Sequence, residues 1–239
     1  VRVTNWDTQT DTKTEAYTYV HGAADHLALT WVDSNGDPAS AVTNATDDVN
    51  FTTTYHPVVV IQDSYDQTVT SGAASTYQIT VATDSTTPGA TVNGTTSVDA
   101  VGGKASFTNL KFNGTSGQNY KLYFASADMS KSVKSANIAL ATGALDHFTV
   151  SPATATDLAV DQTLNVSAQA EDVYGNPVET ADITVVFSEI KSASADAQTT
   201  GSFGSVTKTD SSGVATAVFT PSHSAGTATS PGSFTLSMT

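Results

Sequence analysis

Short runs of alternating apolar and polar residues follow one another along most of the chain. Examples are HLALTW at 26–31, YQITVAT at 77–83 and KLYFAS at 121–126, and clusters of Gly, Pro, Asn or Asp separate such runs. Alternation with a period of two is typical of strands with one buried face, and these separating clusters are typical of turns. The pattern predicts an all-β protein in which antiparallel strands pack as sandwiches.

One stretch of sequence occurs twice. Residues 135–150, SANIALATGALDHFTV, repeat the pattern of residues 14–29, TEAYTYVHGAADHLAL, at a constant offset of 121 positions. In each copy a short strand passes through a hinge of small residues, with Gly22 or Gly143, into a strand that begins Asp-His. Such a joint indicates tandem domains. It predicts an N-terminal strand segment at 1–22, a first sandwich at 23–142 and a second sandwich at 143–239.

The strands of the two sandwiches do not match in number. The second lacks a counterpart of residues 132–140, whereas an unmatched copy of that strand stands at 16–20. An incomplete sandwich exposes unpaired backbone groups that can accept a strand from elsewhere. We predict that the N-terminal segment of one copy completes the second sandwich of the next, through Val1, Val3, Tyr17, Tyr19, Phe234 and Leu236. The alternative is a slice of a longer tandem array, whose missing strand follows Thr239.

Composition and charge narrow the classes of function. The net charge is −14, and the nine Lys and Arg residues form no cluster, which argues against nucleic acid as a partner. There is no cysteine, so disulfides and thiolate metal sites are excluded. No apolar run approaches the ~18 residues that a membrane span requires. The sequence also lacks the HExxH and GxSxG motifs and a phosphate-binding loop, so we predict that the protein is not an enzyme.

The sequence from Val58 to Phe124, with VVVIQDSYDQTVTSG and KASFTNLKF, and the stretch AQAEDVYGNPV at 168–178 resemble a known family. They are similar to the tandem immunoglobulin-like repeats of large prokaryotic surface proteins, which include S-layer proteins, adhesins and invasin-type stalks. The family pattern Asp-x-Tyr-Gly-Asn-x-Val is matched in full at 172–178. At 63–69 it is matched only in part, because Asp66 and Gln67 replace Gly and Asn.

The resemblance implies immunoglobulin-like sandwiches, an extracellular location and a role as a spacer or building block. We therefore predict a structural subunit of a surface layer or filament, whose partners are copies of itself or neighbouring repeats. The alternative is a stalk or adhesive module that binds glycan or host protein. Trp6 and Trp31 could stack on sugars, although we expect them to pack at a domain joint.

Calcium is the one cofactor that the sequence suggests. Asp33, Asn35 and Asp37 place oxygen ligands at alternate positions, as in the first half of a calcium loop, but the twelfth position is Asn44 and not Glu. An Asx-rich turn between strands is the favoured alternative. Four further candidate calcium ligands recur beside the hinges and before the turn tyrosines: Asp25, Asp63, Asp146 and Asp172. Their alternative role is to cap backbone N–H groups.

Two other sets of residues recur in the sequence. His26 and His147 occupy equivalent positions, and we expect each to be packed at a domain joint. The sequons Asn-x-Ser/Thr, which are candidate glycosylation sites, begin at Asn44, Asn50, Asn93, Asn113 and Asn165.

Overall fold

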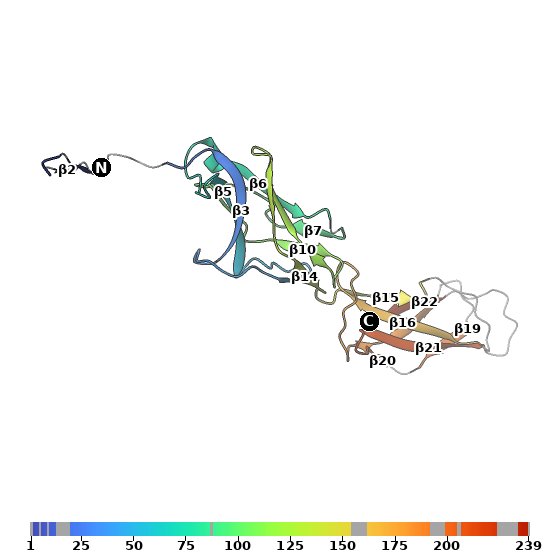
Figure 1. Cartoon of the computed structure of the whole chain (residues 1–239). Coiled ribbons are helices and arrows are strands. Elements are labelled where there is room, and N and C mark those ends of the chain that lie inside the picture. The colour runs from blue at the N-terminus through green and yellow to red at the C-terminus, as the bar shows by residue number, and fades with distance from the viewer. Residues whose placement is uncertain are drawn as a thin grey trace. The chain divides into compact units, whose positions relative to one another are not determined.

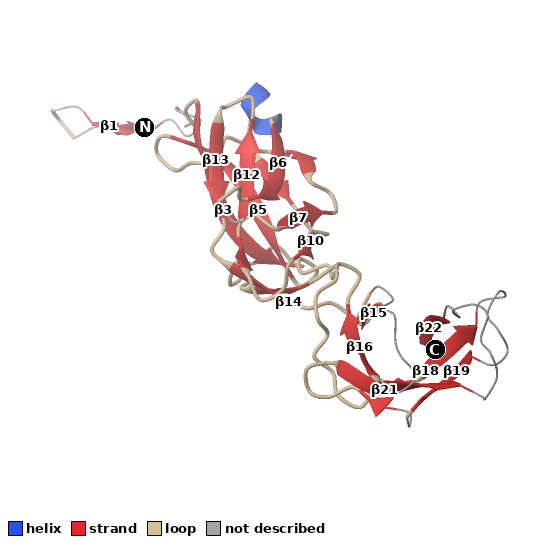
Figure 2. Ribbon diagram, turned by 90° about the vertical axis from the view of Figure 1, so that its right-hand side faces the viewer, coloured by secondary structure: helices blue, strands red, loops and turns tan. Residues whose placement is uncertain are grey.

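The computed structural model describes all of the chain except residues 1, 5, 9, 13–19, 87, 154–161, 192–198, 205–206, 224–233 and 239. The described residues form strands and connecting turns, with one short 3₁₀ helix, η1 (Ala73–Thr76), as Figures 1 and 2 show. The predicted all-β fold class is therefore confirmed. No helix in the described part of the chain is long and apolar enough to cross a membrane.

The chain forms two compact units. Unit 1 comprises Val1–Ala45, Asn50–Phe112 and Asn119–Ile138, and unit 2 comprises Thr46–Val49, Asn113–Gln118 and Ala139–Thr239. Two short loops from the first half of the sequence, 46–49 and 113–118, thus belong to unit 2. The domain boundaries given above follow the sequence repeat and stay a prediction.

Unit 1 is built on two antiparallel sheets. The strand order of the first sheet is β3 (Ala24–Asp33), β5 (Tyr55–Asp63), β9 (Lys104–Ser106). The strand order of the second sheet is β13 (Lys131–Lys134), β12 (Leu122–Ser126), β6 (Gln78–Thr83), β8 (Ser97–Asp99). Shorter pairings join β10 (Lys111–Gly114) to β7 (Ala90–Asn93), and β14 (Ile138–Ala141) to β11 (Asn119–Tyr120) and β4 (Asn44–Thr46). Several of these strands are labelled in Figure 1, in the part of the chain coloured from blue to green.

The core of unit 1 follows from the alternation of its strands. On β5, Val59 and Ile61 point to one face, are fully buried and lie opposite Leu29 and Leu27 of β3. Phenylalanine rings also pack in this core, and each ring buries more surface area than an aliphatic side chain. The ring of Phe112 stacks on that of Phe51 with centroids 5.0 Å apart, and Phe107 and Phe124 make a tilted pair at 5.2 Å.

Unit 2 repeats the antiparallel arrangement with smaller core residues. Its main sheet has the order β15 (His147–Ser151), β16 (Leu164–Glu171), β21 (Val214–His223), β19 (Thr199–Phe203). Two further pairs are β17 (Thr184–Val185) with β20 (Thr207–Lys208) and β18 (Phe187–Lys191) with β22 (Phe234–Met238). Ala168 and Ala215 are fully buried opposite each other, and the ring of Phe219 crosses Gly201, where a Cβ would lie 2.1 Å from the ring.

The N-terminal segment contains a small hairpin of β1 (Arg2–Thr4) and β2 (Thr10–Thr12). Trp6, in the turn of this hairpin, is 95% exposed, whereas Trp31 on β3 is buried. The expectation that both tryptophans pack at a joint is therefore wrong for Trp6, because the two-stranded hairpin offers it no buried face.

Candidate functional site

An aspartate-capped turn recurs in the described part of the chain and organises the candidate site residues. In each copy, Oδ1 of an aspartate accepts the backbone N–H groups of the residues two and four positions later, at 2.8–3.0 Å. The residue three positions after the aspartate is left-handed, with a φ between 62° and 89°. The aspartates are Asp33, Asp63, Asp172 and Asp210, and the left-handed residues are Gly36, Asp66, Gly175 and Gly213.

The candidate calcium loop at 33–37 is one of these turns. Asp33 Oδ1 accepts the N–H groups of Asn35 and Asp37, and the amide nitrogen Asn35 Nδ2 lies 3.4 Å from Asp33 Oδ2. The backbone hydrogen bonds from Asp37 and Asn35 hold the pKa of Asp33 below its ordinary value. These contacts are those of an Asx-rich turn, and calcium binding here stays a prediction. Among the described residues, no three His, Asp or Glu side chains gather into a group that could hold a metal ion.

Asp63 and Asp172 each accept a third N–H group, from the hinge glycine of the sequence repeat. Gly22 N donates to Asp63 Oδ2 at 2.6 Å, and Gly143 N donates to Asp172 Oδ2 at 2.9 Å. A Cβ on either glycine would lie 3.3 Å from that oxygen, so a larger residue would crowd the hydrogen bond. The repeated pairing of hinge and turn therefore has a structural cause: each carboxylate ties the start of a domain's first strand to the turn after β5 or β16.

In unit 2 the Asp172 turn belongs to a buried polar cluster. The amide nitrogen of Asn176 lies 2.8 Å from Gly114 O, 2.9 Å from Asp172 Oδ2 and 3.2 Å from Asp47 Oδ2. Its oxygen, Oδ1, accepts the N–H group of Ser116 at 2.9 Å. One amide therefore joins the turn to both loops, 46–49 and 113–118.

The two carboxylates of this cluster have pKa values shifted in opposite directions. Burial, together with the nearby charge of Asp172, raises the pKa of Asp47 from 3.8 to about 6, although Gly114 N donates to its Oδ1 at 3.1 Å. Burial acts on Asp172 in the same direction, but the hydrogen bonds from Asn176, Gly143 and Tyr174 outweigh it and lower its pKa. Near neutral pH, the ionised form of Asp172 is therefore stabilised by hydrogen bonds from N–H groups, whereas ionisation of Asp47 lowers the stability of the folded protein.

The remaining candidate ligands lie beside the two equivalent histidines. His26 Nδ1 is 3.3 Å from Asp25 Oδ2, and His147 Nδ1 is 3.1 Å from Asp146 Oδ2. On the other side of the rings, Nε2 of His26 is 3.2 Å from Asp66 Oδ1, and Nε2 of His147 is 3.3 Å from Glu171 Oε2. The side chains of His26 and His147 are 34% and 44% exposed, and each imidazole lies between two carboxylates. Their packing at a domain joint stays a prediction.

The five sequons differ in accessibility. Asn44, Asn93 and Asn165 are exposed. Asn113 is 5% exposed and its amide donates to Asp48 Oδ1, and Oδ1 of Asn50 accepts from the N–H and hydroxyl groups of Thr52. Glycosylation stays a prediction at all five positions, with the first three open to solvent.

The predicted interface residues are only partly described. Val1, Tyr17 and Tyr19 lie outside the described residues. Val3 stands in β1 opposite Asp11, and Phe234 and Leu236 stand in β22, where they pair with Lys191 and Glu189 of β18. The interface itself stays a prediction.

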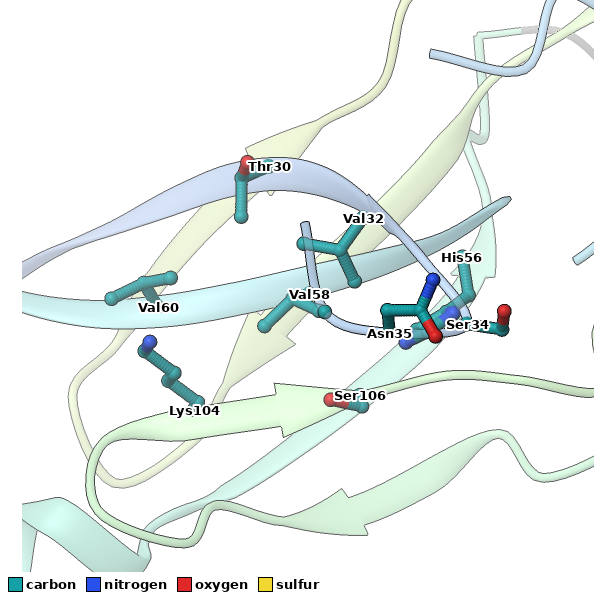
Figure 3. Close-up of a pocket in the computed structure, with 10 residues that line it drawn as sticks. Thr30, Val32, Ser34, Asn35, His56, Val58, Val60, Lys104 and Ser106 are labelled. Atoms are coloured by element: carbon teal, nitrogen blue, oxygen red, sulfur yellow. The ribbon is translucent and has the colours of Figure 1, made fainter. Parts of the chain in front are cut away.

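An open groove of about 400 Å³ lies on the sheet β3–β5–β9. Figure 3 shows Lys104 and Ser106 of β9 beside Val58 and Val60 of β5, with Thr30 of β3 nearby. Its lining residues include hydroxyls, valines, one lysine and one histidine but no carboxylate.

Two residues of the capped turns and the buried cluster were not predicted from the sequence. Asp210 caps the fourth turn, and its signal was the spacing Asp-x-x-Gly, which occurs as DSNG, DVYG and DSSG. Asp47 carried no local signal, because its partner Asn176 is 129 residues away.

Comparisons with known proteins add little to this picture. No protein-family model and no curated protein sequence matches the chain. Among solved structures, a bacterial integrin-binding invasin is similar over 89% of this chain and 36% of its own length, with 14% identity and a TM-score of 0.35. A β-glucuronidase from Parabacteroides merdae is similar over 90% of this chain and 25% of its own length, with 9% identity and a TM-score of 0.24. The chain thus spans about a third or less of the length of these proteins.

Proposed function

We propose that the chain is a non-enzymatic structural subunit of an extracellular surface layer or filament, which assembles head to tail by strand addition. The observation that carries the proposal is the edge of β22. In unit 1, β12 pairs with β6 on one side and β13 on the other. In the described part of unit 2, β22 stands at the same place in the strand order and pairs with β18 alone.

At the offset of 121, the segment 16–20 corresponds to residues 137–141 and so to β14 of unit 1. There, β14 pairs with β11 and β4 and buries Ile138 and Leu140, whose places in the repeat Tyr17 and Tyr19 hold. Each backbone hydrogen bond contributes roughly 1 kcal/mol net, and each buried tyrosine adds about 1.5–3 kcal/mol. Five bonds and two tyrosines give about 8–11 kcal/mol, which exceeds a minimal association cost of about 4 kcal/mol.

The donor that we propose is the segment 16–20, AYTYV, of another copy. Its alternation places Tyr17 and Tyr19 on one face and Thr18 on the other. Negative-stain electron microscopy and sedimentation of purified chain test the proposal. Tyr17→Asp combined with Tyr19→Asp should abolish assemblies, as should deletion of residues 1–20, whereas Thr18→Asp, the matched control, should retain them. Assemblies that survive the deletion would refute strand donation.

An adhesive module is the second candidate, and the exposure of Trp6 favours it. An indole that is 95% exposed can stack on a sugar ring, whereas buried Trp31 cannot. A glycan array separates the two functions: binding that is lost in Trp6→Ala would support adhesion, and an array without signal would count against it.

A further inference from the structure

The open groove on the sheet β3–β5–β9 is not part of the assembly contacts proposed above. Its floor contains Val58 and Val60 of the central strand β5, which alternation turns to the face opposite the core. The register places Val58 between Thr30 of β3 and Ser106 of β9, and Val60 beside Lys104. Side chains of the two flanking strands line the groove on either side of the valines, which are 5% and 8% exposed. The groove therefore has an apolar floor with mainly polar side chains around it.

The polar groups around this floor donate hydrogen bonds or both donate and accept them. They are the hydroxyls of Thr30, Ser34 and Ser106, the amide of Asn35, the imidazole of His56 and the ammonium group of Lys104. None of the lining residues is Asp or Glu, although the chain has 23 acidic residues against nine basic ones. The groove thus carries a positive charge on a protein that is acidic as a whole.

Lys104 supplies this positive charge. The ammonium groups of Lys134 and Lys208 lie 2.9 Å from Asp84 and 3.4 Å from Asp182. Lys104, in contrast, makes no ion pair with any residue that the structure describes. It can therefore bind the anionic group of a ligand, in a charge-assisted hydrogen bond, without breaking an existing ion pair.

A capped turn holds the other polar end of the groove in place. Figure 3 shows Ser34 and Asn35 of this turn at the end of the groove that lies away from Lys104. The N–H groups of Asn35 and Asp37 donate to Asp33 Oδ1 at 2.8 and 2.9 Å, so the Asp33 carboxylate is engaged within the turn. Polar groups that are fixed before binding lose less conformational entropy when a ligand arrives, which favours affinity.

We propose that the groove binds an acidic sugar residue of a glycan: its carboxylate or sulfate group contacts Lys104, and its ring lies on Val58 and Val60. Sugar hydroxyls both donate and accept hydrogen bonds, which suits the hydroxyl, amide and imidazole groups around the floor. An acidic peptide side chain only accepts hydrogen bonds and leaves most of these groups unused. The volume of about 400 Å³ lies within the range of small-ligand sites. The site is independent of strand addition and of Trp6.

NMR titrations of the ¹⁵N-labelled full chain test the site. The probes are a sulfated heparin tetrasaccharide, a carboxylated oligogalacturonate, neutral maltotetraose and a hexaglutamate peptide. We expect an acidic oligosaccharide, sulfated or carboxylated, to shift the amide resonances of residues 30–36, 56–60 and 104–106. Neutral maltotetraose should bind roughly ten-fold more weakly, because it lacks the charge that Lys104 contacts. The stronger of the two acidic probes identifies the anionic group.

Substitutions in the groove should change the affinity for the acidic probe. Lys104→Glu should weaken binding roughly ten-fold or more, whereas Lys104→Arg should retain it. Lys131→Glu makes the same charge change at an exposed position of β13 and is the matched control, which should leave the affinity within about two-fold. Thr30→Val keeps the shape of the side chain but removes its hydroxyl, and it should weaken binding several-fold even if Lys104→Glu fails to fold.

Several results would overturn the proposal. An absence of shifts at about 10 mM acidic probe, or equal losses in Lys104→Glu and Lys131→Glu, would refute a specific site. Loss of binding in Trp6→Ala but not in Lys104→Glu would place sugar binding at the exposed indole. Tighter binding of hexaglutamate than of both acidic oligosaccharides would make the groove a peptide site. Assembly is measured separately by electron microscopy, so failure of this site leaves the proposed function standing.

Discussion

Asp47→Asn is the substitution that tests the account of the buried cluster most directly. Asp47 is 2% exposed, and its carboxylate faces the Asn176 amide and the charge of Asp172. A pKa raised from 3.8 to about 6 means that the folded protein binds the proton more tightly than the unfolded chain. The neutral form of Asp47 is therefore the stabilising one. Its contribution is complete below about pH 3.8, declines as the pH rises, and is lost above about pH 6.

The size of the effect follows from the same shift. Because one unit of pKa corresponds to about 1.4 kcal/mol, ionised Asp47 costs unit 2 about 2–3 kcal/mol at pH 7. Asparagine has the shape of the neutral acid, and the introduced amide can donate to Asp172. We expect Asp47→Asn to raise Tm by roughly 5–10 °C at pH 7. The difference from the unmodified protein should shrink to less than about 1 kcal/mol at pH 4.

Differential scanning calorimetry at pH 4, 5.5 and 7 measures this pH dependence. Asp48→Asn is the matched control: it removes one charge from the adjacent, exposed position but keeps the oxygen Oδ1 that accepts from the amide of Asn113, so its effect should stay within about 0.5 kcal/mol at each pH. Equal pH slopes for the unmodified protein and Asp47→Asn between pH 4 and 7 would refute the assignment of a destabilising charge to Asp47.

Four further substitutions test the turns, the buried polar cluster and the core of unit 1. Asp66→Gly should stabilise unit 1 by up to about 1 kcal/mol in urea titrations, because a left-handed φ is costly for a residue with a Cβ. Gly175→Asp should destabilise unit 2 by a similar amount for the same reason. Unchanged urea midpoints would contradict the strain argument. Asn176→Ala removes the amide that joins the two carboxylates to Gly114, and we expect a loss of about 2–4 kcal/mol by calorimetry, whereas a loss below 1 kcal/mol would show that the cluster is not cooperative. Phe112→Ala removes a fully buried ring and should cost about 3–5 kcal/mol, with exposed Tyr65→Ala as the control that leaves the midpoint unchanged.

The two turn motifs at 63–67 and 172–176 show how much of the local geometry can be predicted from the local sequence. The family pattern Asp-x-Tyr-Gly-Asn is complete at 172–176, whereas in the first copy Asp66 replaces its glycine. The structure shows the same turn in both, because Asp66 adopts a φ of 62° and its carboxylate lies 3.2 Å from His26 Nε2. Aspartate tolerates the left-handed region better than most residues, so the capping carboxylate and not the glycine defines the turn.

The sequence by itself determined the all-β class and the recurrence of hinge and turn. These features depend on neighbours within a few positions: the alternation of apolar residues, and a carboxylate that reaches the N–H groups two and four positions later. Only the tertiary structure decided that Asp47 is buried, that Asn176 bonds it across 129 positions, and that the loops 46–49 and 113–118 belong to unit 2. The physical reason is that burial and the resulting pKa shift arise from segments brought together by the fold, and no periodicity within the chain records which distant segments meet.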